Sequence, residues 1–395
     1  MPAPKVALVG ASVRAAAQSA LRAGFSAVSA DLFADADLAA VCPASRIADY
    51  PAGLVDWLAE IECDGWLYTG ALENQPALVD QMAALKPLWG NAGQSLRACR
   101  DPLRLQAVCG RREIPFPETR VETASVPRDG AWLAKSYQGS SGSGVWRLDG
   151  EAAVQRAERE RAVAQRFVAG TPAAAIFTLG NESAELWGVT RQLLGGDPER
   201  PWRYAGSIGP LPGSKKILCG LNQLGQMLRE DFGLRGIVGA DLIVAEDGFH
   251  LLEVNPRYTA SVEVLERARG RSAIAAHLAA CGAEVEDPEG GSGHADASDD
   301  AMPEPVHGKA ILYAPAEVRV LPSFAEFALD AALHDPRRLL ADIPRAGELI
   351  RRGDPLLTAF AAGRTIEECA SRLDEFTAEI LSRPFGYNDG AWSVP

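Results

Sequence analysis

The sequence predicts a mixed α/β and α+β protein with more than one domain. Residues 5–33 read as a strand, a helix and a second strand, which is the βαβ unit of a parallel sheet. Residues 236–254 read as two strands around a short acidic turn, which is an antiparallel hairpin. The chain has 395 residues, more than one average hydrophobic core accommodates, so two or three domains are expected.

Composition excludes several functional classes. The 47% of hydrophobic and 23% of charged residues are ordinary globular values. The net charge of −13 argues against nucleic acid as a partner, because a phosphate backbone needs a basic surface. The seven cysteines contain no CxxC pair, which argues against a zinc site or a disulfide framework. No segment has the form of a signal peptide or the length of a membrane span, so a cytoplasmic protein without a membrane partner is expected.

The N-terminal segment is expected to be a Rossmann-like domain. KVALVG, residues 5–10, is a buried parallel-type strand, and residues 11–23 form an alanine-rich helix that ends at Gly24. FSAVSADLF is the next strand. A dinucleotide fingerprint needs three glycines at the first turn, and only Gly10 is present. A nicotinamide oxidoreductase is therefore a weak alternative.

Polar residues follow the end of the strand DGWLYTG, residues 64–70. Glu73, Asn74 and Gln75 either face a ligand crevice or begin and cap a helix, and the sequence favours neither. Farther along, IPFPET contains two prolines, so it cannot be helical and is expected to be an extended link into the next domain.

A lysine precedes a turn rich in glycine and serine in AWLAKSYQGSSGSGVWRL, residues 131–148. Glycines let backbone N–H groups face an anion, and Lys135 adds a point charge for phosphate oxygens. A P-loop would place the lysine after the glycines and open a helix, so the Walker motif is excluded. A flexible hairpin loop would have a similar sequence. The candidate anion-binding residues of the turn are Gly139, Ser140, Ser141, Gly142, Ser143 and Gly144.

The most informative segment is the predicted hairpin GIVGADLIVAEDGFHLLEVNPRYTAS, residues 236–261. Glu253, Asn255 and Arg257 point to one face if the extended conformation continues. A three-residue turn places Asp241 opposite Glu253, whereas a two-residue Asp-Gly turn places them on opposite faces. Facing carboxylates repel unless a cation lies between them, and the oxygen of Asn255 completes a ligand set that suits Mg²⁺. An ordinary hairpin with acids on a solvated face is the alternative.

The motif HLLEVNPR, with the earlier Asp241, resembles the metal-binding strand of the ATP-grasp ligases, and the lysine-led turn resembles their lid. The resemblance implies an ATP-grasp fold with a Rossmann-like N-terminal domain and a small C-terminal α+β domain. The expected boundaries are residues 1–105 for the N-terminal domain, 106–282 for the ATP-grasp domain with a lid at about 120–170, 283–304 for a flexible acidic linker, and 305–395 for the C-terminal domain.

The resemblance also implies the cofactors ATP and Mg²⁺ or Mn²⁺. The metal would lie on Asp241, Glu253 and Asn255, while Lys135 and Arg257 would be the catalytic residues. The turn from Gly139 to Gly144, with its glycines and serines, would close over the phosphates.

Adenine would be held by the strand within RAVAQRFVAGTPAAAIFTLG, residues 161–180. The implied residues are Gln165, Phe167 and Val168, of which the last two fit a plain core strand equally well. Relatives often place a glutamate for the ribose shortly after this strand, but this chain has Pro172 and Ala173. The bend after Arg257 would lie over the acceptor substrate, which makes candidates of Tyr258, Thr259 and Ser261; Ser261 is also a candidate helix N-cap.

The implied function is an ATP-dependent carboxylate–amine ligase that forms an amide through an acyl phosphate. Its partners would be a small-molecule carboxylate and an amine; a homodimer is compatible with the resemblance. DIPRAGELIRRGDPLLTAFAAG, residues 342–363, is similar to a segment of the carboligase-like group that includes tyramine–glutamate ligase, so a methanofuran or tetrahydromethanopterin type of pathway is one expectation. The rival is an ATP-binding protein or subunit without ligase activity.

Overall fold

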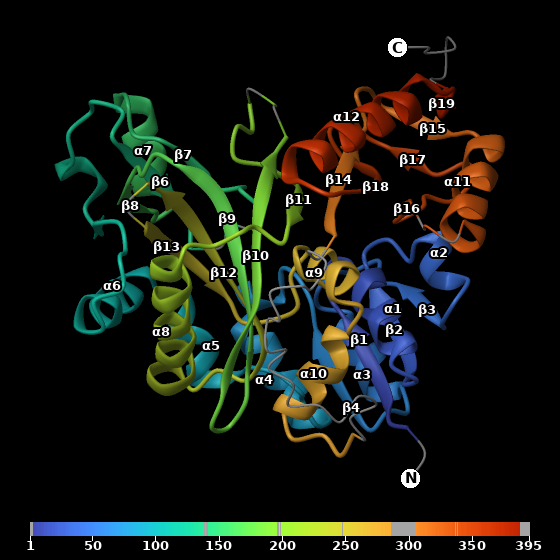
Figure 1. Ribbon diagram of the computed structural model, residues 1–395, viewed down its shortest axis with the longest axis horizontal. Helices are drawn as coiled ribbons and strands as arrows, with labels where there is room; N and C mark the ends of the chain where they lie inside the picture. The colour runs from blue at the N-terminus through green and yellow to red at the C-terminus, as the bar shows by residue number, and fades with distance from the viewer. Residues whose placement is uncertain are drawn as a thin grey trace.

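The computed structural model describes residues 3–387, except for 138, 140, 196, 198, 247, 286–304, 336 and 338. Within these residues the strands form a four-stranded sheet near the N-terminus, a second four-stranded sheet, an eight-stranded sheet and a small three-stranded sheet. In Figure 1 the N-terminal part lies below the C-terminal part. The second four-stranded sheet lies at the left, on the opposite side of the large sheet from the C-terminal part. No helix within the described ranges combines the length and the apolar character that crossing a bilayer requires.

The N-terminal sheet is parallel and has the order β3-β2-β1-β4. Successive residues of β1 are buried on alternate faces of this sheet, because Val6 and Leu8 pack in one hydrophobic cluster while Ala7 and Val9 pack in another. The predicted βαβ unit is confirmed. Its elements are β1 (Lys5–Val9), α1 (Arg14–Arg22), β2 (Ser26–Asp31), α2 (Ala36–Ala39), β3 (Ala44–Arg46), α3 (Leu54–Glu60) and β4 (Gly65–Tyr68).

Three helices lead from this sheet to the second four-stranded sheet, which we call the lid sheet. They are α4 (Pro76–Leu85), α5 (Gly93–Arg100) and α6 (Pro102–Arg111), and a short 3-10 helix, η1 (Leu72–Asn74), precedes them. The lid sheet has the order β5-β8-β6-β7 and is antiparallel. The lid sheet has a separate hydrophobic cluster, which includes Trp132, Leu148 and Val154. The elements are β5 (Thr119–Arg120), η2 (Thr123–Ser125), β6 (Trp132–Lys135), β7 (Val145–Arg147), α7 (Glu151–Arg159) and β8 (Val163–Arg166).

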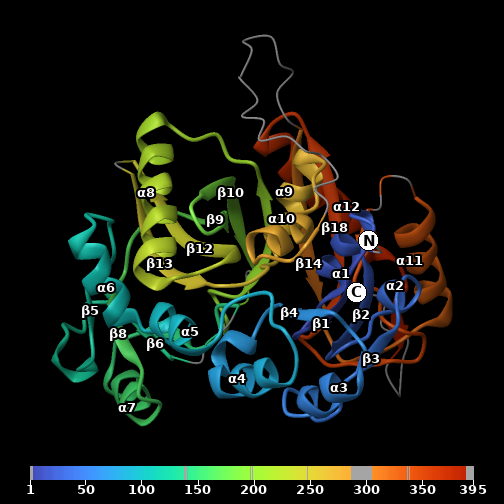
Figure 2. The ribbon, with the colours of Figure 1, turned by 90° about the horizontal axis from the view of Figure 1, so that it is seen from below.

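The eight-stranded sheet has the order β13-β12-β9-β10-β11-β14-β18-β16. Helix α8 covers one face of its first strands, and α9 and α10 cover the other face, as Figures 1 and 2 show. Phe177 packs toward α8, whereas the neighbouring Ile176 packs with α1 and α10, so the sheet is buried on both faces. The elements are β9 (Thr171–Leu179), β10 (Ala184–Leu194), β11 (Tyr204–Gly209), α8 (Lys215–Phe232), β12 (Gly236–Ala245), β13 (Gly248–Asn255), α9 (Val262–Arg269) and α10 (Ala273–Ala280).

The C-terminal segment continues the same large sheet. Strand β14 joins the eight-stranded sheet, while β15 joins the three-stranded sheet β17-β15-β19. The elements are β14 (Val306–Tyr313), β15 (Val318–Val320), α11 (Pro322–His334), β16 (Leu340–Ala341), β17 (Leu349–Ile350), β18 (Pro355–Gly363), α12 (Ile366–Ser382) and β19 (Gly386–Tyr387). Most of the expected linker, residues 286–304, lies outside the described residues.

A buried charge network joins the three parts of the chain. Arg14 of α1 forms ion pairs with Glu263 of α9 and, at 2.9 Å, with Asp342. The Lys309 ammonium group of β14 lies 3.2 Å from the other oxygen of Glu263. Arg14, Glu263 and Lys309 are each no more than 4% exposed. Removing one partner of such a network leaves an uncompensated buried charge.

We predict that Glu263→Gln destabilises the protein by about 3–5 kcal/mol at neutral pH, measured by denaturant unfolding, because Arg14 and Lys309 lose their shared partner. Burial opposes ionisation of Glu263, but Arg14 and Lys309 outweigh it and hold its pKa well below the ordinary 4.5. The stabilisation is therefore present above about pH 4.5 and is lost as the pH falls through the folded-state pKa. The difference between wild type and variant should be constant above pH 6 and should narrow from pH 5 downward.

Glu185→Gln is the matched control, because it removes the same charge from a surface pair with Arg271. Its expected cost is no more than about 1 kcal/mol. Equal costs for the two variants, or a Glu263→Gln difference that widens in acid, would contradict the assigned role of the network.

Candidate active site

The hairpin brings Asp241 directly opposite Glu253, through a backbone arrangement that the sequence did not indicate. Ala245 pairs with Gly248, so Gly248 belongs to β13 and not to the turn. The expected three-residue turn is therefore wrong. The register then shifts between Asp241 and Leu242, where Leu252 is the extra residue of a β-bulge. This shift restores the pairing that the turn alone would have lost, and it places both carboxylates at one cavity.

Two cations neutralise Glu253. The Lys135 ammonium group lies 3.3 Å from one carboxylate oxygen, and the Arg100 guanidinium lies 3.9 Å from the other. Lys135 also donates to the carbonyl of the bulged Leu252 at 3.4 Å. Burial raises the pKa of the Glu253 carboxyl, but Lys135 and Arg100 outweigh that effect and lower it to about 2. Glu253 is therefore fully ionised at neutral pH.

Asp241 differs, because its partners are neutral amides. Gln192 donates to one oxygen at 3.0 Å, and Asn255 donates to the other at 3.1 Å. Burial, followed by repulsion from Glu253, raises the pKa of Asp241 to about 7. Within the described ranges Asp241 forms no ion pair with a side chain. Asp241 is thus the less stabilised of the two carboxylates, and a cation beside it would relieve the repulsion from Glu253.

The residues here fit a hard divalent cation. Two carboxylates on adjacent strands and one amide are an all-oxygen donor set. Elsewhere in the described part of the chain, no group of three His, Cys, Asp or Glu side chains is placed to hold a metal ion. The Asn255 oxygen faces Arg100 at 3.4 Å, while its amide nitrogen faces Asp241. Asn255 would therefore offer its oxygen to a cation beside Asp241 only after its amide group turns over.

Arg257 lies at the same cavity and is anchored from the N-terminal domain. Its guanidinium donates to Glu73 at 2.5 Å, and Glu73 is 2% exposed. Burial opposes ionisation of Glu73, but the paired Arg257 lowers its pKa. Asn74 donates to the carbonyl of Gly139 at 3.3 Å. Neither alternative for these polar residues holds in full. Gln75 is at the N-cap position of α4, while Glu73 and Asn74 lie in η1 and contact Arg257 and Gly139 without lining the cavity.

Two further residues contact the predicted set and were missed. Arg100, at the end of α5, donates to Asn74 at 3.0 Å and to the carbonyl of Val254 at 3.1 Å. Gln192, on β10, donates to Asp241. Neither residue belongs to a recognisable motif, because each comes from an element whose approach to the hairpin depends on tertiary packing.

The lid sheet, residues 165–168, which we call the hinge strand, and the β12–β13 hairpin line a cavity of about 240 Å³. Ser140 lies outside the described residues. The structure places the following predicted residues at the cavity: Lys135, Gly139, Ser141, Gly142, Ser143, Gln165, Phe167, Val168, Asp241, Glu253, Asn255, Arg257, Thr259 and Ser261.

Three expectations are corrected here. Tyr258 does not line the cavity, because its side chain is 3% exposed and its hydroxyl donates to Glu266 at 2.7 Å. Gly144 does not line it either; its carbonyl accepts the Ser136 N–H at 2.8 Å and closes the base of the turn. Ser261 occupies the N-cap position of α9, but its side chain makes no capping hydrogen bond, and its hydroxyl lies 2.9 Å from that of Ser207.

The end of the cavity away from the carboxylates is apolar. Leu133 of the lid sheet faces this space together with Pro172, Leu194 and Ile243 of the large sheet. Among the described lining residues the only acids are Asp241 and Glu253.

The glycine- and serine-rich turn is held against the large sheet. The Tyr204 N–H donates to the carbonyl of Ser141 at 3.1 Å. Gly142 has φ of +79°, and a Cβ atom there would lie 1.7 Å from the carbonyl oxygen of Trp202. A side chain at this position is incompatible with the closed turn.

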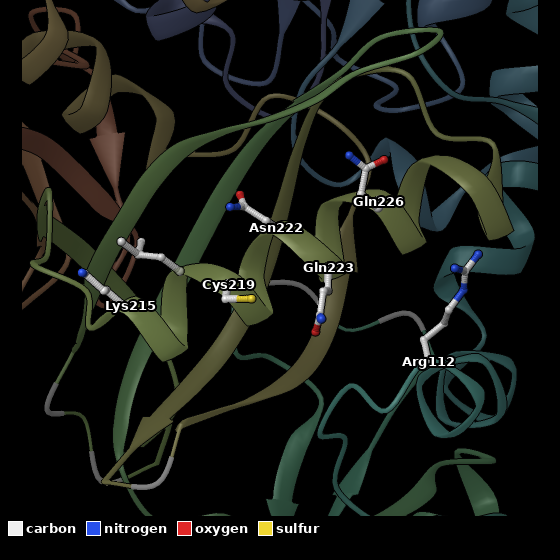
Figure 3. Close-up of a pocket in the computed structure, with 7 residues that line it drawn as sticks. Arg112, Lys215, Cys219, Asn222, Gln223 and Gln226 are labelled. Carbon is white, nitrogen blue, oxygen red and sulfur yellow. The ribbon is translucent and has the colours of Figure 1, made fainter. Parts of the chain in front are cut away.

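A second hollow of about 650 Å³ lies on the outer side of α8, away from these residues. Figure 3 shows its wall of Lys215, Asn222, Gln223 and Gln226, with Arg112 approaching from a neighbouring segment. It holds no carboxylate pair and none of the predicted residues, so it is not the candidate site.

We predict that Gly142→Ala weakens Mg-ADP binding by at least about tenfold and speeds proteolytic cleavage of the turn, because the added methyl group pushes the turn away from Trp202. Calorimetry and limited proteolysis measure the two effects. Gly150→Ala is the control, since a Cβ atom there meets nothing within 4 Å. Identical behaviour of both variants would show that the closed turn is not needed for binding.

Comparisons with known proteins agree with this geometry. Residues 99–261 match the family described as ATP-grasp domain. The sequence matches none of the curated proteins with which it was compared.

Solved structures resemble the chain over nearly its whole length. N5-carboxyaminoimidazole ribonucleotide synthetase in its ADP complex has a TM-score of 0.67 at 16% identity, covering 96% of this chain and 98% of the other. L-amino acid ligase from Bacillus licheniformis has a TM-score of 0.67 at 14% identity, covering 96% and 98%. The biotin carboxylase domain of 2-oxoglutarate carboxylase from Hydrogenobacter thermophilus has a TM-score of 0.69 at 13% identity, covering 98% and 91%.

At such identities these structures establish the fold and not the reaction. The family match, the facing carboxylates and the glycine-rich turn over them point the same way. Residues 99–261 of this chain match the ATP-grasp domain family, and the chain as a whole has the ATP-grasp fold.

Proposed function

We propose that this protein is an ATP-dependent ligase that joins a carboxylate to an amine through an acyl phosphate. The observation that carries the proposal is the pair Asp241 and Glu253, which face each other at one cavity with Lys135 and Arg257. Two acids and two cations under a glycine-rich turn suit a polyphosphate and its metal. Neither an NAD site nor a simple solvated hairpin requires this arrangement.

Each side chain has a role that its position allows. Lys135 and Arg257 neutralise charge on the phosphate that is transferred, and both already lie at the cavity. Arg100 and Gln192 hold Glu253 and Asp241 in place. The turn from Gly139 to Gly144 excludes water, which would hydrolyse a reactive acyl phosphate.

Asp241, Glu253 and Asn255 would hold Mg²⁺ or Mn²⁺. When bound, such an ion supplies charge stabilisation and a template for the phosphates. Because Asp241 has a raised pKa, the pair is suited to take up a cation in exchange for a proton.

The reaction needs no protein nucleophile. A substrate carboxylate oxygen attacks the γ-phosphorus of ATP and ADP leaves, which gives an acyl phosphate. The amine nitrogen then attacks the acyl carbon, the C–N bond forms, and the C–O bond to phosphate breaks with loss of one proton from the amine. Thr259 and Ser261 lie at the cavity beyond Arg257 and are our proposed contacts for the acceptor substrate.

The names of the similar structures support this class of reaction. They include a synthetase of carboxyaminoimidazole ribonucleotide, an L-amino acid ligase and a biotin carboxylase domain. Within the superfamily we place the chain with the carboligase-like group, in small-molecule or cofactor biosynthesis of a methanofuran or tetrahydromethanopterin type. An ATP-binding subunit without ligase activity would bind nucleotide through the same residues but would release no phosphate.

The discriminating experiment is a phosphate-release screen over pairs of carboxylates and amines, including amino acids. A ligase releases phosphate only when both substrates are present, and the amide appears in equal amount by mass spectrometry. Nucleotide binding without phosphate release across such a screen would favour the non-catalytic alternative.

We predict that Glu253→Gln lowers substrate-dependent phosphate release on the order of 100-fold or more, because one of the two facing carboxylates is lost. Glu246→Gln is the matched control, as it removes the same charge from the exposed end of the same hairpin. It should retain wild-type rates. Full activity of Glu253→Gln would remove the metal assignment.

A further inference from the structure

The segment between β10 and β11 carries an aromatic residue that no motif of the sequence singled out. Trp202 lines the cavity, and its ring centroid lies 6.1 Å from that of Phe167. The Arg147 guanidinium lies over both rings, 4.7 Å from the Phe167 centroid and 5.8 Å from that of Trp202. Three side chains from three separate segments thus form an aromatic corner at one end of the cavity.

The register of β10 shows which end this is. Gln192 contacts Asp241, whereas Leu194 pairs with Tyr204, about 7 Å farther along the strand. Trp202 lies two residues before Tyr204 in the chain. The aromatic corner therefore lies at the apolar end, away from the carboxylates and next to Leu194 and Pro172.

The indole of Trp202 has an unused donor. Its Nε1 atom is buried and finds no hydrogen-bond partner among the described residues. A buried N–H without a partner is costly and rare, so a ligand that accepts a hydrogen bond would satisfy it. The acids that line the cavity lie at the opposite end, which leaves Trp202 as a polar contact for a sugar or base here.

The position of Trp202 is fixed from outside the cavity. Arg203 donates to the carbonyl of Gly353 at 3.1 Å, and its guanidinium lies 3.7 Å from the centroid of the Tyr313 ring. The Tyr313 hydroxyl donates to the carbonyl of Tyr204 at 2.6 Å. The C-terminal strands thus hold the residues on the C-terminal side of Trp202 in place, so the ring is presented rigidly to a ligand.

We propose that Trp202 is a specificity-determining residue that contacts the nucleoside part of the bound nucleotide, with its ring beside the base and its N–H toward a nucleoside oxygen or nitrogen. This inference rests on the proposed function, in that the cavity must bind a nucleotide. It goes further by assigning the nucleoside end to an aromatic side chain of the β10–β11 segment, in place of an acid after the hinge strand.

The test separates the nucleoside from its phosphates. Binding of Mg-ADP and of inorganic tripolyphosphate with Mg²⁺ is measured by calorimetry on the full chain, for wild type, Trp202→Ala and Trp202→Phe. Trp202→Ala should bind ADP roughly 5- to 150-fold more weakly, the usual effect of removing an aromatic side chain from a base. Trp202→Phe keeps a ring and loses the donor, so a weakening of roughly fivefold is expected. Tripolyphosphate binding should not change in either variant.

Trp146→Phe is the control, because the Trp146 indole donates to the carbonyl of Ala153 in α7 and does not line the cavity. Trp146→Phe should bind ADP with wild-type affinity. ADP binding should quench the tryptophan fluorescence of the wild type more than that of Trp202→Phe. If Trp202→Ala does not fold, Trp202→Phe and the quenching carry the test.

Two results would overturn the inference while the proposed function stands. One is unchanged ADP affinity in both Trp202 variants. The other is an equal loss for ADP and tripolyphosphate, which would show that Trp202 acts by holding the turn at Gly142. A wild-type protein that binds no ADP would instead refute the nucleotide site itself.

Discussion

The site depends on the repulsion between two carboxylates that the backbone forces to face each other. Asp241 and Glu253 are partners on adjacent strands, and the pairing is fixed by a tight turn and a β-bulge rather than by side-chain preference. Lys135 and Arg100 stabilise the charge of Glu253, while Asp241 has only amides. Two facing carboxylates repel each other and destabilise the fold, and a cation bound beside them removes that repulsion.

The surrounding architecture brings together groups that are distant in the chain. Lys135 comes from the lid sheet, Arg100 from the helix that leads into the domain, and Arg257 from the strand end, where Glu73 of the N-terminal domain orients it. The turn that covers them contacts Asn74 on one side and the β10–β11 segment on the other. The buried network of Arg14, Glu263 and Lys309 then fixes the domains against one another. Closure of the site is therefore coupled to the packing of all three parts of the chain.

The sequence predicted what depends on local pattern. The βαβ unit and the two strands of the hairpin follow from apolar runs and turn residues, and both are present. The facing of Asp241 and Glu253 was predicted only conditionally, because a bulge at Leu252 cannot be read from apolar periodicity. The sequence could not decide how Glu73 and Asn74 are used, since that depends on the approach of Arg257 and Gly139 from another domain.

Long-range packing accounts for the residues that were missed or misplaced. Arg100 and Gln192 contact the carboxylates from elements without any motif, and Trp202 lies in a connecting segment that matches no motif either. Tyr258 follows the informative Arg257 directly, but β13 ends at Asn255 and the Arg257 N–H donates to the carbonyl of Asn255 at 2.8 Å. The chain therefore bends at Arg257, and the Tyr258 side chain lies in the core, where its hydroxyl donates to Glu266. The expected extended conformation does not continue through this segment, so a place next to Arg257 in the sequence did not place Tyr258 at the cavity.

The most direct test of the central claim is a titration of Mn²⁺ into the protein with and without ADP, in which electron paramagnetic resonance measures the free ion. The account predicts a site whose affinity rises when ADP is present, and which Asp241→Asn and Glu253→Gln each weaken by at least about tenfold. Mn²⁺ binding that neither substitution alters, or that ADP leaves unchanged, would contradict it.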